Sequence, residues 1–303
     1  MRSETRLIAI PLLFLAAACG ASSAPPEGPA PAPAGAEPAP PAGAASPAPA
    51  GDAASPTPAA AAAAPAPQAS AEPSKPAEPA KPSNGCPEGM ARVPGGSFTM
   101  GPLKVQAKVD DLCMDITETT AEQYAACVKA GKCTDSWANC AQEASTYGVA
   151  GKEKNPMVCV DFPQAEAYCK AQGKRLPREE EWEWAARGGA EARPFPWGTT
   201  EPKDQACWSG GGAVRKASCE VGSFPAGANP QGIQDLAGNV FEWTTSGSGN
   251  DGKGKMRVAR GGSWRDGTPQ LMKTARPGGF EVTYRCGFLG IRCVTEPEAS
   301  PAK

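Results

Sequence analysis

The chain has 303 residues, a formal net charge of −2 and no histidine. The absence of histidine excludes Ser-His-Asp and Cys-His nucleophiles, zinc sites built on histidine, and the iron centre of two histidines and one carboxylate. Because the balanced charge gives no basic face for a phosphate backbone, we expect no nucleic-acid partner.

Residues 1–19 have the pattern of a bacterial secretory leader. A positive start with Arg2 and Arg6 precedes the apolar stretch Leu7–Ala18, which is too short to span a bilayer. The stretch ends at Cys19 in a sequence that resembles a lipobox, with Ala16 at the usual leucine position. We therefore expect lipidated Cys19 to anchor the chain to the lipid membrane of the bacterial cell envelope, on the outer membrane or the periplasmic face. The alternative is an ordinary leader that is cut after an Ala-x-Ala site.

Residues 20–85 are dominated by alanine and proline. Of these 66 residues, 25 are alanine and 18 are proline, and none is aromatic or cysteine. Such a segment cannot bury enough apolar surface to offset the entropy lost on folding, so we predict a disordered linker. A plain tether, a glycan-bearing stalk and a linker across the cell wall stay open. We predict one folded domain over residues 86–295 and a disordered tail over residues 296–303.

The folded part is predicted to combine short strands, a few short helices and many loops. Residues 90–100 fit a strand, a Pro-Gly-Gly turn and a second strand. Residues 119–132 fit a helix, because Thr120 and Gln123 can form a capping box and Gly131 stands at the stop.

Two further helices are predicted later in the chain. Residues 163–172 begin with a proline, carry apolar residues at helical spacing and end before Gly173. The third helix starts at Pro177, where the glutamates Glu179–Glu181 suit the positive end of the helix dipole. We interpret these glutamates as a solvated helix start.

A series of short motifs runs through the second half of the folded part. They are KRLP at Lys174–Pro177, EWEWAARGG at Glu181–Gly189, FPWG at Phe195–Gly198, GIQDLAGNVFEW at Gly232–Trp243, RGGSW at Arg260–Trp264 and GIRC at Gly290–Cys293. In this order they resemble the signature of formylglycine-generating enzyme domains, the sulfatase-modifying factors, over residues 86–294. The resemblance implies an irregular, loop-rich α+β fold that is related to C-type lectins.

The chemistry that the resemblance implies depends on a pair of cysteines. In the family, two thiolates shortly after the Gly-Gly-Ser motif bind copper(I), a soft ion, and a substrate cysteine is oxidised to formylglycine. Here Asp266 stands at the first ligand position and Leu271 or a gap at the second, and no cysteine occurs between Cys219 and Cys286. We therefore expect neither bound copper nor formylglycine formation. The sister branch of iron-dependent sulfoxide synthases needs three histidines and is excluded.

The twelve cysteines indicate disulfides in an exported chain. With Cys19 lipidated, eleven remain, so at least one cysteine is left over or pairs between chains. The resemblance implies one bond, between Cys169 and Cys293. Further pairs, chosen mainly for their closeness in sequence, are Cys127–Cys133, Cys207–Cys219, Cys140–Cys159 and Cys86–Cys113, which would leave Cys286 over.

The loop from Asp235 to Glu242 resembles the family's calcium site. The resemblance implies side-chain ligands from Asp235 and Glu242 and carbonyl ligands from Gly238 and Val240. A hard ion such as calcium prefers oxygen ligands of this kind. The alternative is that Glu242 is a buried acid that accepts hydrogen bonds from backbone amides in a tight turn.

The resemblance also places three residues at the former active-site groove: Trp243, Ser263 and Asp266. A residual pocket there would bind a peptide or a glycan, whereas a packed and closed groove is the alternative. Four other tryptophans are interpreted as core and loop-packing residues, namely Trp182, Trp184, Trp197 and Trp264.

Three functions follow from these observations. The first is a non-catalytic, membrane-anchored domain that acts as a binding or structural module in the cell envelope. The second is an active oxidoreductase of the family with unrecognised ligands. The third is a lectin-like carbohydrate binder, which rests on the analogy of fold alone. The missing cysteine pair favours the first function over the second.

Overall fold

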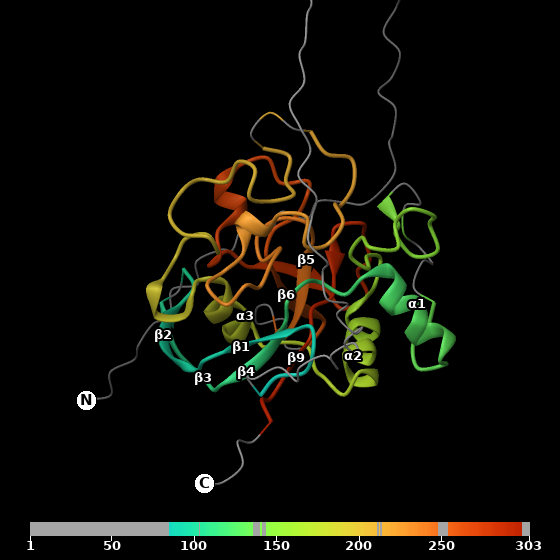
Figure 1. The fold of residues 1–303 in the computed structure, drawn as a ribbon, viewed down its shortest axis with the longest axis horizontal. Coiled ribbons are helices and arrows are strands. Elements are labelled where there is room, and N and C mark those ends of the chain that lie inside the picture. The colour runs from blue at the N-terminus through green and yellow to red at the C-terminus, as the bar shows by residue number, and fades with distance from the viewer. Residues whose placement is uncertain are drawn as a thin grey trace, which may run out of the picture. The chain divides into compact units, whose positions relative to one another are not determined.

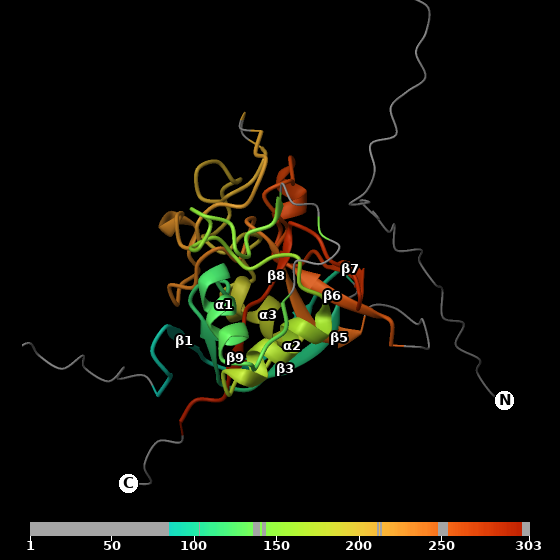
Figure 2. The same cartoon turned by 90° about the vertical axis from the view of Figure 1, so that its right-hand side faces the viewer.

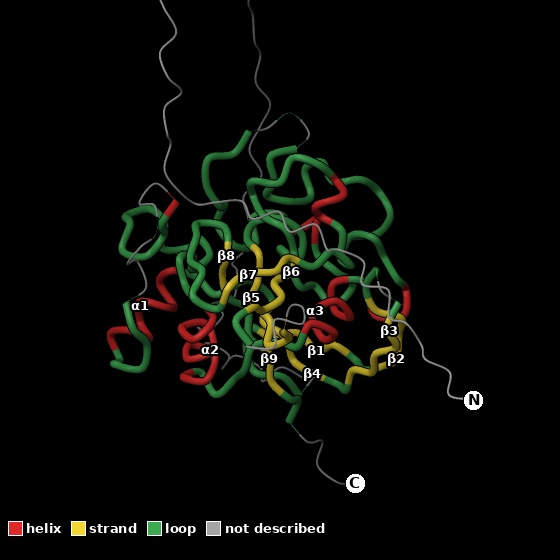
Figure 3. The backbone as a smooth tube through the Cα atoms, turned by 180° about the vertical axis from the view of Figure 1, so that it is seen from behind, coloured by secondary structure: helices red, strands yellow, loops and turns green. Residues whose placement is uncertain are grey.

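The computed structural model describes residues 85–102, 104–135, 140, 144–210, 212, 214–247 and 254–298. The predicted leader with Cys19, the linker up to residue 84 and the last five residues of the predicted tail lie outside the described residues. Loops connect many short elements in the described part, and Figure 3 shows these loops in green. None of the helices in the described ranges is long and apolar enough to cross a bilayer.

The strands of the described residues form three small sheets (Figure 1). The first has the order β1-β4-β9, the second pairs β2 with β3, and the third has the order β7-β6-β5-β8. All of these pairs are antiparallel except β5 with β8. The bounds are β1 Met90–Val93, β2 Gly96–Met100, β3 Val105–Val109, β4 Leu112–Asp115, β5 Phe241–Gly247, β6 Met256–Arg260, β7 Gly278–Glu281, β8 Leu289–Gly290 and β9 Val294–Thr295.

The three predicted helices are confirmed. Both α1 and α2 begin with a full capping box, formed by Thr120 with Gln123 and by Asp161 with Gln164. These two helices lie side by side (Figures 1 and 2), and a tyrosine of one stacks on a tyrosine of the other at a ring-centroid distance of 5.6 Å. The bounds are α1 Ala121–Lys129, α2 Phe162–Ala171 and α3 Glu179–Ala186.

The two strands predicted within residues 90–100 form, but they do not pair with each other. Strand β1 pairs with β4, and Gly96 of β2 lies opposite Val109 of β3. The chain crosses between the two sheets at Gly95, where a Cβ atom would lie 2.5 Å from the carbonyl oxygen of Val109. Only glycine fits such a close backbone approach, so this residue fixes the crossing.

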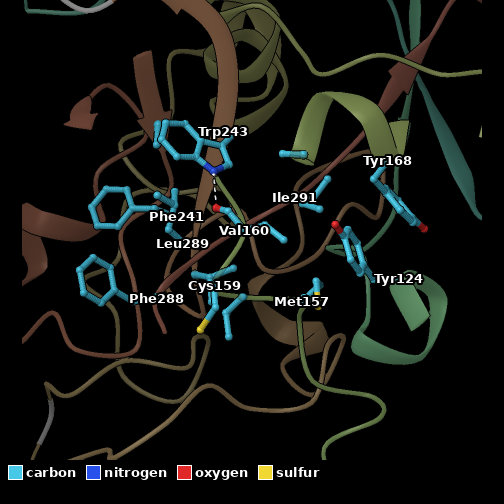
Figure 4. Packing of buried hydrophobic residues seen from close by; sticks show 14 of the residues in the cluster. Tyr124, Met157, Cys159, Val160, Tyr168, Phe241, Trp243, Phe288, Leu289 and Ile291 are labelled. Carbon is cyan, nitrogen blue, oxygen red and sulfur yellow. Dashed lines mark hydrogen bonds between the residues drawn. The ribbon is translucent and has the colours of Figure 1, made fainter. Parts of the chain in front are cut away.

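The largest cluster of buried apolar side chains surrounds Trp243 (Figure 4). The Nε1–H of Trp243 donates to the carbonyl oxygen of Val160 at 3.1 Å. Its ring meets Phe162 and Phe280 edge-on, at centroid distances of 5.9 and 6.1 Å. Because these partners come from α2, from β7 and from the loop before α2, the cluster joins helices and sheet around one aromatic ring.

Four further tryptophans have the packing roles that the sequence predicts. Trp182 and Trp184 of α3 are buried in a second cluster with side chains of β1 to β4. Trp264 is buried and its Nε1–H donates to the carbonyl oxygen of Gly287, while Trp197 stacks on a neighbouring phenylalanine. None of these four rings therefore stands free as a ligand platform.

Five disulfides connect loops and elements within the described residues. The bond between Cys169 and Cys293, implied by the family resemblance, is confirmed and links residues that are 124 positions apart. Cys286 is buried and takes part in none of the five bonds. The four pairs proposed from their spacing are also confirmed, namely Cys86–Cys113, Cys127–Cys133, Cys140–Cys159 and Cys207–Cys219.

The interpretation of Glu179–Glu181 as a solvated helix start is wrong. Glu181 is only 2% exposed, and both terminal nitrogens of Arg175 donate to its carboxylate at 2.7 and 2.9 Å. Glu179 is paired with the buried guanidinium of Arg260. The reason is that α3 packs between sheets, so its first turn is enclosed and its charges need cationic partners.

The described contacts also extend beyond residue 295, the predicted end of the domain. Arg175 pairs with Glu296 at 3.2 Å, and the amide of Glu298 donates to the carbonyl oxygen of Gly85 at 2.8 Å. Two of the first three residues of the predicted tail, Glu296 and Glu298, therefore have partners in the domain.

Candidate functional site

The position that the family resemblance assigns to the active-site groove is a tight turn that follows β6. Gly261 and Gly262 have φ values of 102° and 74°, which turn the chain sharply before Ser263. Asp266 then folds back, and its Oδ2 accepts hydrogen bonds from the Ser263 amide at 2.7 Å and from the Ser263 hydroxyl at 3.4 Å. The structure thus brings Ser263 and Asp266 together, as the resemblance implies.

The environment of Asp266 shifts the pKa of its carboxyl group. Burial raises the pKa of this carboxyl above its ordinary value, although the Ser263 amide and the charge of Arg276 act in the opposite direction. A carboxylate in a turn of this kind is an oxygen acceptor for the backbone. It cannot replace a thiolate as a ligand for copper(I), which prefers sulfur.

The space beside this turn is filled by the segment from Leu271 to Met272. A Cβ atom on Gly262 would lie 2.8 Å from the carbonyl oxygen of Leu271 and 3.4 Å from the sulfur of Met272. Met272 is fully buried and also contacts Gly238, and Ser263 is only 2% exposed. The alternative of a packed groove therefore describes Ser263 better than the open one.

The placement of Trp243 in this groove is wrong. Trp243 is fully buried, and its indole nitrogen points to Val160 in the aromatic cluster (Figure 4). It lies on β5, opposite Ala259 of β6, where the pleat turns its side chain into the core. Trp243 is therefore a core residue and lines no open groove.

The described residues offer no pair of thiols beside Ser263. The chain carries Cys286 next to Trp264, whose indole donates to the adjacent Gly287 carbonyl oxygen at 2.8 Å. All other cysteines of the described residues are held in disulfides. A two-thiolate copper site would therefore need one of these disulfides to open.

The most highly charged part of the interior is built around Glu242 and Arg292. Nε and Nη2 of Arg292 donate to Glu242 at 2.8 to 3.0 Å, and Trp182 Nε1 donates to Glu242 Oε2 at 2.6 Å. Both side chains of the ion pair are 0% exposed. Burial alone would lower the pKa of Arg292, but the Glu242 carboxylate raises it above its ordinary value.

These contacts correct the role of Glu242. Its two oxygens are occupied by Arg292 and Trp182, so the carboxylate is not open to a calcium ion. The alternative reading, in which Glu242 accepts from backbone amides, is wrong as well, because its donors are side chains. The guanidinium of Arg292 supplies the positive charge beside Glu242, and calcium at the loop from Asp235 to Glu242 stays a prediction.

The other end of this charged cluster holds two buried acidic side chains, Glu118 and Asp235. Asp235 accepts the Gly222 amide at 2.6 Å, and Oε1 of Glu118 is buried without a hydrogen-bond partner among the described residues. Burial and the charge of Asp235 raise the pKa of Glu118 well above its ordinary value. No group of three or more acidic, histidine or cysteine side chains converges as a metal site within the described ranges, so an ion here also needs amide or carbonyl oxygens.

Sequence reasoning missed Glu118 and the buried partner of α3, Arg260. Arg260 is fully buried and pairs with Glu183 at 2.8 Å. Arg260 ends β6 and Arg292 lies between β8 and β9, and both stand between buried apolar or small neighbours, which is a visible signal of a buried ion pair. Glu118 lies in a polar stretch, and nothing in its neighbourhood along the chain marks it as buried.

A comparison with models of known protein families gives the family of this chain. The model of the sulfatase-modifying factor enzyme 1-like domain matches residues 75–297. The chain belongs to this family. Its fold is the loop-rich α+β, C-type-lectin-like fold that the sequence predicts.

The curated proteins that are similar to this domain include one that is named an enzyme and one that is named inactive. It is 42% identical over 172 residues to "Inactive C-alpha-formylglycine-generating enzyme 2" of Bos taurus, covering 52% of this chain and 55% of the relative. It is 34% identical over 145 residues to the formylglycine-generating enzyme of Mus musculus, covering 40% and 38%. The chain thus spans about half the length of the curated relatives it matches first.

Solved structures share the fold of this domain. The crystal structure of CarF superposes with a TM-score of 0.59 at 20% identity, covering 69% of this chain and 98% of CarF. At this identity the likeness shows the fold alone.

Proposed function

We propose that the chain is a non-catalytic member of its family that acts as a binding or structural module in the bacterial cell envelope. The observation that carries this proposal is the turn at Asp266. Its carboxylate accepts the Ser263 amide at the position where the family chemistry needs a thiolate, and Met272 fills the adjacent space. With no cysteine between Cys219 and Cys286, the oxidase has no ligand pair.

The relatives support the proposal without deciding it. The bovine relative carries the word inactive in its name, and it is the most similar of the curated proteins described above. The mouse formylglycine-generating enzyme is less similar over a shorter stretch. A scaffold that keeps its motifs, disulfides and core while it lacks reactive ligands is suited to presenting loops to a partner.

Membrane anchoring is part of the same proposal. Lipidation at Cys19 would hold the domain at the envelope, and the Ala/Pro-rich segment would act as its tether. A peptide or a glycan is the ligand class that we propose for the exposed loops. The lectin-like alternative would be supported by a calcium-dependent hit on a glycan array, and an array without such a hit would oppose it.

The decisive experiment measures copper binding and oxygen use. The purified full chain is titrated with copper(I) and then incubated with a cysteine-containing peptide while oxygen consumption is recorded, with the mouse enzyme as positive control. We expect no tight copper binding, no oxygen uptake above background and no aldehyde on the peptide. Tight copper binding together with peptide-dependent oxygen uptake would overturn the proposal and restore the oxidoreductase alternative.

A further inference from the structure

A cation contacts one sulfur of the disulfide between Cys207 and Cys219. Nη1 of Arg215 donates to the sulfur of Cys219 at 3.1 Å. Cys207 is 1% exposed, whereas Cys219 is half-buried and lies closer to the solvent. Sulfur in a closed disulfide is a weak acceptor, but the same contact becomes strong when the sulfur carries a negative charge. The contact therefore favours a state in which the disulfide is open.

Three other contacts hold Arg215 in this position. Its amide donates to the hydroxyl of Ser209 at 2.9 Å, and its Nε donates to the carbonyl oxygen of Trp208 at 3.0 Å. Its guanidinium lies over the ring of Phe224, 5.4 Å from the centroid. None of these contacts neutralises the charge, and no carboxylate pairs with Arg215 among the described residues. The positive charge is therefore available to the sulfur of Cys219.

The backbone holds both cysteines next to Asn239. The amide of Asn239 donates to the carbonyl oxygen of Cys207 at 2.8 Å, and its side-chain oxygen accepts from the amide of Cys219 at 3.0 Å. These hydrogen bonds do not involve the sulfurs. We therefore expect the two cysteines to stay close together when the disulfide opens, so that it can close again.

The disulfide between Cys127 and Cys133 provides a reference within the same chain. It also joins a buried residue to a half-buried one, and it also closes a short loop, of 6 positions against 12. In the part of the chain that the structure describes, no hydrogen bond from a cation reaches either of its sulfurs. The guanidinium of Arg215 therefore distinguishes the two disulfides.

We propose that Cys207–Cys219 is a thiol-reactive disulfide whose reaction partner is a dithiol, and that Arg215 favours its reduced form. A cation next to a cysteine sulfur stabilises the thiolate relative to the thiol. A disulfide whose reduced form is stabilised in this way has a higher reduction potential, which is typical of labile disulfides. The site needs no copper, and the proposal goes beyond the non-catalytic function without depending on it.

The exchange has two steps. A thiolate of the dithiol attacks the sulfur of Cys219 and forms a bond to it, while Cys207 leaves with the electron pair of the broken bond and takes up a proton. The second thiolate of the dithiol then attacks the first sulfur of its own molecule and releases Cys219 as a thiolate beside Arg215. The dithiol loses two electrons and becomes a cyclic disulfide, and the chain gains two electrons. Arg215 thus stabilises the charge on the sulfur that leaves in the second step.

The test equilibrates the full chain with mixtures of reduced and oxidised dithiothreitol. Acid quenching, alkylation and peptide mass spectrometry give the reduced fraction of each disulfide. We expect Cys207–Cys219 to be half-reduced at a ratio of reduced to oxidised reagent at least about tenfold lower than Cys127–Cys133 requires. Arg215→Met is expected to raise this ratio about tenfold for Cys207–Cys219 and to leave Cys127–Cys133 unchanged. Lys216→Met is the matched control, because it removes the same charge from the exposed neighbouring residue, and it is expected to behave as the wild type does.

Two outcomes would overturn the proposal. The first is a wild-type chain in which Cys207–Cys219 needs the same mixture as Cys127–Cys133, or a more reducing one. The second is an Arg215→Met variant whose ratio for Cys207–Cys219 equals that of the wild type. If this variant does not fold, both of its disulfides become reducible together, and the comparison of the two disulfides in the wild type decides alone. The copper and oxygen measurements do not depend on this equilibrium, so either proposal can fail by itself.

Discussion

At the scale of single residues, Asp266 is a carboxylate that the fold holds in a partly buried turn. Burial raises its pKa in the folded state, so the folded chain binds this proton more tightly than the unfolded chain does. The tighter proton binding contributes to the free energy of unfolding. This contribution is fully present below the pKa of the unfolded chain, about 3.9, and is lost as the pH rises through the pKa of the folded chain.

We therefore predict that Asp266→Asn gains stability relative to the wild type as the pH rises from about 4 to 7. The amide oxygen keeps the hydrogen bond from the Ser263 amide, while the cost of a buried charge disappears. Urea unfolding at several pH values measures this difference. Asp266→Ala, which loses the acceptor, is the control and is expected to be less stable than the wild type throughout. A difference between the Asn variant and the wild type that does not change with pH would contradict the prediction.

The ion pair of Arg292 and Glu242 leads to a second prediction. Arg292→Met leaves the Glu242 carboxylate buried with no cation, which is expected to lower the free energy of unfolding by roughly 3–5 kcal/mol. Lys108→Met is the control, because Lys108 and Asp110 are both largely exposed, and we expect a change within about 1 kcal/mol. Denaturant titrations of the two variants give the comparison, and equal losses would show that burial is not the decisive factor.

At this scale the sequence shows which residues have a special role better than it shows which residues they contact. The contact between Ser263 and Asp266 follows from their separation by three residues in a turn after two glycines. The sequence offers Glu242 either as a calcium ligand or as a buried acid, but its partner Arg292 lies 50 positions away and only the folded chain brings them together. The burial of Glu118 could not be predicted for the same reason, since it depends on loops that are distant in sequence.

At the scale of elements, the disulfide between Cys169 and Cys293 ties α2 to the residue before β9. The bond closes a loop of 124 positions, whereas Cys127–Cys133 closes one of 6 positions at the end of α1. In the loop-entropy description the long loop contributes roughly 4–5 kcal/mol and the short one roughly 2 kcal/mol.

We predict that replacing Cys169 and Cys293 together by serine destabilises the domain by about 2 kcal/mol more than replacing Cys127 and Cys133 together. Both double variants keep the other disulfides, so the comparison isolates the length of the loop. Denaturant midpoints under non-reducing conditions are the measurement. Equal midpoints for the two double variants would mean that strain or residual structure outweighs chain entropy.

Local signals explain why the helices could be predicted and the sheets could not. The capping boxes of α1 and α2 are complete within four residues, so the sequence contains the whole start of each helix. Strand pairing has no such local code. β1 and β2 are neighbours in sequence with a turn-like link, yet each pairs with a later strand, and the register of β9 with β4 joins residues about 180 positions apart.

At the scale of the whole molecule, a loop-rich domain needs fixed points that do not come from long helices or sheets. This chain obtains them from five disulfides within the described residues and from buried ion pairs such as Arg292 with Glu242 and Arg260 with Glu183. None of these fixed points requires copper. The scaffold therefore does not depend on reactive metal ligands, which is the physical basis of the non-catalytic role that we propose.

The proposed place of the molecule at the membrane depends on Cys19. A lipidated cysteine carries more than one acyl chain, which is enough for stable anchoring, and the 66-residue segment after it would reach up to roughly 200 Å if extended. Cys19→Ala in a bacterial host should therefore move the chain from the membrane fraction to the soluble fraction, while Ser23→Ala, close by in the sequence, should leave it with the membrane. Fractionation followed by immunoblotting measures this, and metabolic labelling with a fatty acid tests the modification directly. Wild-type chain found in the soluble fraction without label would instead support the ordinary leader, cut after Ala-x-Ala, and would leave the domain unanchored by this route.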